Sequence, residues 1–283
     1  MRHLTPATIL FALALAAPSV MADTPDYCPD VEGPTKVYAV GSSTMGSVLG
    51  PMLKRMFKAQ GVKMNRWGKA SSGLARPDFH DWPKLMPGLM RKHKPYIVVI
   101  SMGSNDFQSI WHRKKWIGFG EDRWDEIYAE RVDRMLKAAG GDNSHRLVVW
   151  EGPYAFKGNK ARKRAPVVNR IMKERVAAYV KGGGKAVFID AFEATTDAKG
   201  RPLDRAKLSG KKVDIRGGDG IHLTVDAVRA LLAEPILEAV RPCLHPDEAV
   251  AAQADSDDDG GDKTEPDPPA ERHEGKPDKG QGS

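Results

Sequence analysis

Short apolar segments alternate with longer amphipathic segments along residues 35–240 of this 283-residue chain, and this alternation constrains the fold more than any other feature. The short segments are rich in valine and isoleucine and end at turn-forming residues, which is typical of strands buried on both faces of a parallel sheet. A further short strand is expected just before Trp67. The other expected strands cover residues 36–41, 96–103, 146–153 and 186–191.

The longer segments have apolar residues three and four positions apart and end at glycine or proline, which is typical of helices with one buried face. They cover residues 47–61, 123–141, 165–184 and 224–240. Because strands and helices alternate, we expect an α/β fold. It would be a single three-layer domain at residues 35–245, with a parallel sheet flanked by helices in an SGNH-like or flavodoxin-like arrangement.

The first 22 residues have the pattern of a secretory signal peptide, because Arg2 and His3 precede an apolar run that ends in cleavage-site-like residues. We expect this segment to be removed, which leaves a short N-terminal segment at 23–34 and a periplasmic or secreted protein. The alternative is an uncleaved anchor, but the run is shorter than the roughly 18 to 20 residues of a spanning helix. No later segment is apolar enough to span a membrane.

The chain has two cysteines, Cys28 near the start of the mature chain and Cys243 after the last expected helix. In an oxidising compartment an even number of cysteines favours a disulfide. Such a bond would join the two ends of the domain. The alternative is a pair of unpaired thiols.

Residues 246–283 are poor in large apolar side chains and rich in Asp, Gly, Pro and Lys, so we expect a disordered acidic tail. This tail has 12 acidic and four basic residues, which leaves a net charge of +15 on the rest of the chain. A basic body favours anionic partners, namely nucleic acid, anionic lipid or an acidic glycan. Export makes nucleic acid the least favoured of the three, and we expect no nucleic-acid partner.

Four short polar motifs lie at the expected ends of strands or in the loops that follow them, where parallel α/β sheets place their chemistry. They are Gly-Ser-Ser at 41–43, Ser-Gly at 72–73, Gly-Ser-Asn-Asp at 103–106 and Asp-Gly-Ile-His at 219–222. Alone, each motif is typical of a turn or a helix cap. Together and in this order, they resemble the four blocks of the SGNH hydrolase superfamily, the GDSL-type esterases and lipases.

The resemblance implies a role for each matching residue. Ser43 would be the nucleophile, with Asp219 and His222 completing a catalytic triad, while Ser43, Gly73 and Asn105 would form the oxyanion hole. A serine hydroxyl needs a base such as an imidazole to accept its proton, and the aspartate orients that ring. Losing one oxyanion donor typically costs about 2.7 to 4 kcal/mol in the barrier. We expect glycine at 73 because it lets the backbone approach the substrate.

Ser42 stands where the family usually has aspartate, and serine is expected to support the same turn by bonding to backbone amides. A narrower resemblance, carried by residues 71–83, 103–108 and 219–224, is to a periplasmic bacterial branch of the superfamily. It implies a role in the cell envelope but supplies no substrate.

Tryptophans and basic residues alternate directly after the third motif. We expect the aromatic and basic side chains of this stretch to form part of a binding wall for an acylated glycan, by stacking and by charge, because loops at this edge often line pockets. These side chains are Trp111, Trp116 and Trp124 with Arg113, Lys114 and Lys115. Arg76, Asp78 and Trp82, beside Gly73, are expected to have a similar role. The alternative is that the tryptophans pack in the core and the lysines are solvated.

No zinc-binding or nucleotide-binding pattern is present in the sequence, so no metal or cofactor is expected. The sequence therefore predicts an exported serine esterase that removes O-acyl groups, with acetyl the favoured group, from an acylated carbohydrate or a small ester. An O-acyltransferase with the same site and a catalytically weak glycan-binding scaffold remain alternatives. The oligomeric state is left open.

Overall fold

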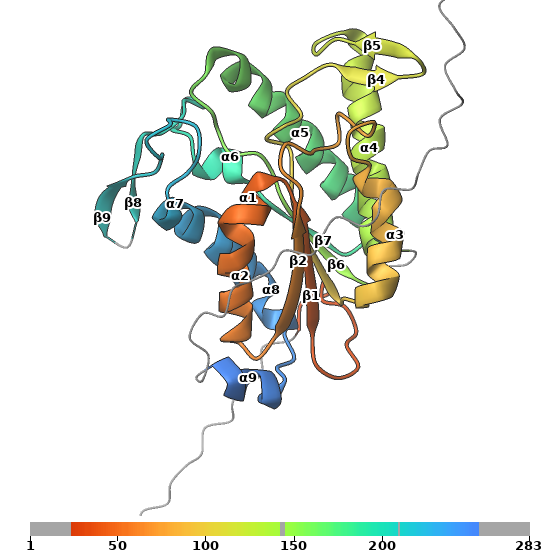
Figure 1. Ribbon diagram of the computed structural model, residues 1–283, viewed down its shortest axis with the longest axis vertical. Coiled ribbons are helices and arrows are strands. Elements are labelled where there is room, and N and C mark those ends of the chain that lie inside the picture. The colour runs from red at the N-terminus through yellow and green to blue at the C-terminus, as the bar shows by residue number, and fades with distance from the viewer. Residues whose placement is uncertain (1–23, 142–144, 209, 255–283) are drawn as a thin grey trace, which may run out of the picture.

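A central sheet of five parallel strands organises the computed structural model, which describes residues 24–141, 145–208 and 210–254 (Figure 1). Its strand order is β2-β1-β3-β6-β7, the order of flavodoxin-like folds. The strands are β1 (Lys36–Gly41), β2 (Lys63–Gly68), β3 (Ile97–Ser101), β6 (Leu147–Glu151) and β7 (Ala186–Ile189). The α/β fold with a parallel sheet is therefore confirmed.

The interior strand β3 is formed mostly by valine and isoleucine, its neighbour β6 has the sequence Leu-Val-Val-Trp-Glu, and every residue of both strands is buried. In register, Gly41 lies beside Ser101, and Ser101 lies beside Glu151, so these residues mark the carboxyl edge of the sheet. Gly41 is required at this edge, since a Cβ there would lie 2.7 Å from the Cβ of Met45. The chain can thus turn sharply from β1 into the next helix.

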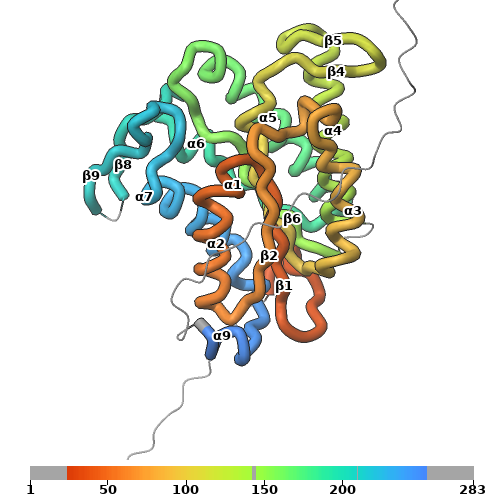
Figure 2. The backbone as a smooth tube through the Cα atoms, viewed as in Figure 1, coloured from red at the N-terminus to blue at the C-terminus, as the bar shows by residue number. Residues whose placement is uncertain are grey.

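Helices cover both faces of the sheet, which gives three layers (Figures 1 and 2). One apolar cluster joins the sheet to the first helices and the C-terminal helices, and a second joins it to three long helices on the other face. The first face carries α1 (Ser43–Ser47), α2 (Leu49–Lys58), α7 (Val225–Val228), a π-helical turn η1 (Arg229–Ala233) and α8 (Glu234–Val240). The second face carries α3 (Trp82–His93), α4 (Asp122–Gly140) and α5 (Asn159–Lys181).

Shorter elements complete the described chain. There are two antiparallel hairpins, β4 (Ile110–His112) with β5 (Lys115–Ile117) and β8 (Arg205–Leu208) with β9 (Lys211–Asp214). In Figure 1 the first lies at the top, near α4, and the second lies at the left side, near α7. The others are α6 (Ala191–Ala194), the 3-10 turn η2 (Arg241–Cys243) and α9 (Glu248–Ala254).

Cys28 and Cys243 form a disulfide across 215 residues of sequence, as the cysteine count favours. It joins the N-terminal segment to the end of the helical layer, and both cysteines lie in the core. Tyr27 adds a second link here, because its hydroxyl donates to the Ala239 carbonyl at 3.2 Å. The two ends of the fold are thus held together.

The boundary expected at residue 245 is too early. Helix α9 follows it, and the backbone N–H of Asp247 donates to the Gly61 carbonyl at 2.8 Å. The start of the expected disordered tail is therefore structured, while residues 255–283 lie outside the described residues, as does the expected signal peptide. Within the described part of the chain, no helix is both long and apolar enough to cross a membrane.

Candidate active site

The turn after β1 places Ser42 and Ser43 at the carboxyl edge of the sheet. Ser42 is 3% exposed, its N–H donates to the Ser101 carbonyl at 3.2 Å, and its own carbonyl accepts from Gly46 at 3.1 Å. Its side chain makes no capping hydrogen bond to α1, so the expected bond from the Ser42 hydroxyl to backbone amides is not formed there. Backbone bonds hold this turn, and Ser43 begins the helix in a half-buried position.

The fourth motif forms a tight loop that orients the His222 ring. One carboxylate oxygen of Asp219, Oδ1, accepts the backbone N–H groups of Ile221 at 2.8 Å and His222 at 2.9 Å. The other, Oδ2, lies 2.5 Å from His222 Nδ1. Gly220 has a φ of +67°, which lets the loop close on itself. A single aspartate therefore shapes the loop and holds the imidazole.

The electrostatics of this pair fix the state of the ring. The hydrogen bond with His222 and those from the backbone N–H groups lower the pKa of Asp219 to about 2. An ionised carboxylate can only accept hydrogen bonds, so His222 Nδ1 carries the proton and donates it. In neutral His222, Nε2 is then free to accept a proton, as a general base must. The side chain of His222 is 61% exposed, and that of Asp219 is 47% exposed.

The second and third motifs are in direct contact. Asn105 Nδ2 donates to the Ser72 carbonyl at 3.0 Å, next to Gly73, and an amide group has a second N–H to offer. Gly73 is buried, and a Cβ built on it would collide with the Asp106 carboxylate, with Cγ at 2.7 Å. Our expectation that Gly73 is needed for approach to a substrate is thus incomplete, because close packing against Asp106 already requires glycine.

A buried polar network that the sequence analysis missed holds these two motifs. Asp106 is fully buried and accepts the N–H of Ala75 at 2.7 Å and the hydroxyl of Tyr128 at 2.7 Å. Arg131 donates to the carbonyls of Leu74 at 2.9 Å and Ala75 at 2.7 Å. Hydrogen bonds from these buried side chains to the backbone of Leu74 and Ala75 therefore hold the loop from Ser72 to Arg76 in place.

Burial dominates the titration of this network. It raises the pKa of the Asp106 carboxyl and lowers that of Arg131, while the hydrogen bonds and opposite charges within the network act against both shifts. The pKa of Tyr128 lies well above its usual value because the phenol is buried beside Asp106. Tyr128 and Arg131 lie three residues apart on α4, a spacing that places both on one helix face.

Tyr154, also missed in the sequence, links the first and last motifs. Its phenol shares a hydrogen bond with the Thr44 side chain, next to Ser43. Burial, together with the negative charges of Glu151 and Asp219, raises the pKa of Tyr154 to about 12. Tyr154 therefore lies close to both the start of α1 and the Asp219 loop. Its position just after β6, at the carboxyl edge, was the signal in the sequence.

Comparison with known proteins identifies the family of this chain. Residues 36–239 match the family described as "Protein of unknown function (DUF459)". The chain belongs to the DUF459 family. No curated protein sequence matches this chain.

Solved structures with low sequence identity share the fold of this DUF459 protein. An acetyl esterase mutant with an acetate ion has a TM-score of 0.51 at 14% identity, over 73% of this chain and 98% of its own. An acetyl xylan esterase from Geobacillus stearothermophilus has a TM-score of 0.49 at 14% identity, and the match covers 77% of this chain and 99% of the esterase. A family 3 carbohydrate esterase from Clostridium thermocellum has a TM-score of 0.48 at 14% identity, and the match covers 78% of this chain and 98% of the esterase. The DUF459 protein has the SGNH hydrolase fold that its four motifs imply.

In the DUF459 protein, the three tryptophans of the expected wall separate into two groups. Trp111 and Trp116 face each other across the β4–β5 hairpin, with ring centroids 5.1 Å apart, and are 38% and 54% exposed. The guanidinium of Arg76 lies 5.0 Å from the Trp116 ring centroid. Trp124 is fully buried and stacks on Tyr128, so the expectation that it lines a wall is wrong.

The structure of the DUF459 protein brings some of the four sequence motifs into contact but not all of them. Asp219 contacts His222, and Asn105 contacts the loop of Gly73. No hydrogen bond joins the Ser43 hydroxyl to His222 within the described chain. Tyr154 shares a hydrogen bond with Thr44, the residue after Ser43, and lies within electrostatic range of Asp219.

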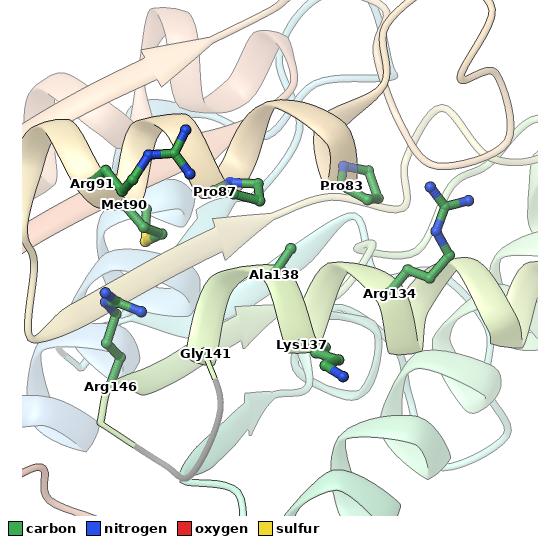
Figure 3. A pocket seen from close by; sticks show the side chains of 9 residues that line it. All are labelled: Pro83, Pro87, Met90, Arg91, Arg134, Lys137, Ala138, Gly141 and Arg146. Carbon is green, nitrogen blue, oxygen red and sulfur yellow. The ribbon is translucent and has the colours of Figure 1, made fainter.

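A surface cavity of about 470 Å³ lies away from these motifs, between α3 and α4 (Figure 3). None of its lining residues belongs to the four motifs, and four of them are cationic: Arg91, Arg134, Lys137 and Arg146. In the ranges that the structure describes, no group of three or more His, Cys, Asp or Glu side chains is arranged to hold a metal ion.

Proposed function

We propose that this protein is an exported serine esterase that removes O-acyl groups, favouring acetyl, from an envelope or extracellular carbohydrate. The observation that carries the proposal is the Asp219–His222 pair, whose geometry leaves His222 Nε2 as a proton acceptor at the sheet edge where Ser43 begins α1. The fold, shared with an acetyl esterase at 14% identity, supports a hydrolase of this type.

The reaction would proceed in two steps. His222 Nε2 removes the proton of the Ser43 hydroxyl as its oxygen attacks the ester carbonyl, and the same proton then passes to the departing sugar oxygen. Water, deprotonated by His222, next attacks the acyl-Ser43 ester and releases the carboxylic acid and the free serine. The charge on the carbonyl oxygen would be met by the N–H groups of Ser43 and Gly73 and by the second Nδ2 hydrogen of Asn105.

The exposure of His222 favours hydrolysis over acyl transfer to a sugar. Its side chain is 61% exposed, so bulk water reaches the base directly. A transferase must instead keep water from the acyl-enzyme. We therefore propose water as the acyl acceptor.

The disulfide supports an extracytoplasmic site of action. Cys28–Cys243 joins the two ends of the described fold, and such bonds form and persist in oxidising compartments. We propose the periplasm or the extracellular space as the location.

A fluorophosphonate probe tests the serine assignment. The purified protein, Ser43→Ala and Ser42→Ala are treated with the probe, and the labelled peptide is identified by mass spectrometry. We expect labelling of the wild type and Ser42→Ala but not of Ser43→Ala, because only a serine activated by a base reacts readily. Equal labelling of Ser43→Ala, or hydrolysis of 4-nitrophenyl acetate that survives this change, would refute the proposal.

A further inference from the structure

The tip of the β4–β5 hairpin has an unfavourable backbone for the residues that occupy it. Its two-residue loop is Arg113 and Lys114, with φ of +46° and +63°. A two-residue turn with both φ values positive strongly prefers Asn-Gly, because other side chains clash with the backbone in the left-handed region. Strain of this kind concentrates at functional sites. The two cationic side chains at this tip therefore call for a reason other than folding.

The positive charge of the tip is not neutralised by the rest of the described chain. Arg113, Lys114 and the following Lys115 are all exposed, and no carboxylate of the described residues forms an ion pair with them. The neighbouring His112 lies within reach of one tip charge. Burial lowers the pKa of His112 most, the charge of Arg113 lowers it further, as do those of Arg123 and Arg131 outside the tip, and Glu130 acts against these effects.

An exposed aromatic surface lies beside these charges. Trp111 and Trp116 form a cross-strand pair, and Arg76 lies over the Trp116 ring. Arg76 is held in place by Asp78, with Nε to Oδ1 at 2.9 Å and Nη2 to Oδ2 at 2.6 Å. Flat aromatic rings with fixed orientation bury the apolar faces of sugar rings at low entropic cost.

This surface is fixed relative to the candidate oxyanion residues. Arg131 Nη2 donates to the Trp111 carbonyl at 2.8 Å, while its Nη1 donates to the Ala75 carbonyl at 2.7 Å, two residues after Gly73. Arg76, which contacts Trp116, follows directly in the same loop. The hairpin and the Gly73 loop are therefore parts of one hydrogen-bonded unit.

We propose that the β4–β5 hairpin is a binding platform for an acidic polysaccharide, with Trp111 and Trp116 contacting sugar rings and Arg113, Lys114 and Lys115 contacting their carboxylates. That this polysaccharide is also the substrate rests on the proposed function. A glycan is favoured over an anionic membrane because the platform is joined to the loop of the candidate oxyanion hole, where the acyl group of a bound chain would react. Without the expected signal peptide, residues 23–245 carry a net charge of +14, which favours the same polyanion.

Binding is measured by isothermal titration with polygalacturonate as the acidic probe and dextran as the neutral one, in the Ser43→Ala background. The decisive variant is Arg113→Asn with Lys114→Gly, because it removes two charges and installs the turn that the backbone prefers. We expect a higher Tm together with a Kd for polygalacturonate raised about tenfold or more, and a slope of log Kd against log salt that is smaller by about two. A variant that gains stability cannot lose binding by misfolding.

Two further variants test the aromatic surface and the position of the charges. Trp116→Ala should raise the Kd about tenfold and Trp116→Phe should restore most of the affinity, because a ring at this position keeps the stacking surface. The matched control, Arg91→Gln with Arg134→Gln in the α3–α4 cavity, removes two exposed charges elsewhere and should leave the Kd within about twofold.

Three results would overturn the platform: an unchanged Kd in the hairpin double variant, an equal loss in the cavity control, or hairpin-dependent binding to phosphatidylglycerol vesicles without binding to polygalacturonate. Failure of the proposed function is a separate outcome. If Ser43 is not labelled by the fluorophosphonate but binding depends on the hairpin, the esterase is wrong and the platform stands. If Ser43 is labelled but the Kd for polygalacturonate is unchanged in the hairpin variants, only the platform is wrong.

Discussion

Glu151 at the end of β6 should make the stability of this protein fall as the pH rises. The side chain is 3% exposed, and burial raises its pKa to about 8 from a usual value of 4.5, against a hydrogen bond from Ser101 that lowers it. Between these two pH values the folded protein keeps a proton that the unfolded chain releases, so the unfolded state binds fewer protons. The free energy of unfolding then decreases with pH by about 1.4 kcal/mol per pH unit, or about 5 kcal/mol over the whole window.

Glu151→Gln isolates this effect, because glutamine has the shape of the protonated acid but does not titrate. Urea unfolding is measured for the variant and the wild type from pH 4.5 to 8.5, and the difference between them cancels other titrating groups. We expect near equality at pH 4.5 and a relative gain for Glu151→Gln that approaches 5 kcal/mol near pH 8 as an upper limit. Glu126→Gln, an exposed change on α4, is the control and should give a flat difference. A flat difference for Glu151→Gln as well would refute the reasoning.

Three other changes test how the site and the fold are held. Gly73→Ala should cost about 1–3 kcal/mol of unfolding free energy in urea and lower kcat, since its methyl group meets a buried carboxylate; unchanged stability and kcat would argue against the close packing. Arg131→Met should cost at least about 3 kcal/mol by losing charged hydrogen bonds to three carbonyls, a loss that denaturation at neutral pH measures and a neutral result would contradict. Reducing Cys28–Cys243, which closes a span of 215 residues, should cost about 5 kcal/mol on the chain-entropy model; Cys28→Ser should then show no further response to reductant.

The sequence predicts the sheet well because burial on both faces leaves a local signature. The interior strands are short segments rich in apolar and β-branched residues, and β1, β3, β6 and β7 each lie within an expected segment. Helix α3 is missed because Pro83, Pro87 and Gly88 interrupt its apolar pattern. In the structure Pro83 lies in the first turn, where its missing N–H costs nothing, and Asp81 caps the helix by accepting from Lys84 at 3.2 Å.

Helix α5 shows a different limit of sequence patterns. It begins at Asn159, six residues before the expected start, because its first turns are rich in lysine and arginine and have no apolar period. One of these residues, Arg164, donates to the Phe107 carbonyl at 2.8 Å, and its guanidinium lies 4.6 Å from the Phe119 ring centroid. Contacts with loops distant in sequence therefore extend this helix, and no local pattern reports such contacts.

The candidate site also has one part that the sequence predicts and one part that only the fold reveals. Asp219 and His222 are three residues apart on one loop, so their pairing follows from local geometry and was expected from the motif. The hydrogen bonds that hold the Gly73 loop join Tyr128 and Arg131 of α4 to Asp106 and to Leu74, which lie 22 and 57 residues away in the sequence. In a sequence, Tyr128 and Arg131 are ordinary helix residues, and only the fold reveals that both are buried.

This division bears on how the site would work. The half with the Gly73 loop has buried charges whose removal would leave unpaired partners, so its donors are held rigidly before any substrate arrives. The half with His222 is 61% exposed and rests on one loop. A bound polysaccharide on the β4–β5 hairpin would lie against the rigid half and leave the exposed base in contact with water. Rigid donors on one side and a solvent-exposed base on the other would favour deacylation by water, which is why we propose hydrolysis at this site.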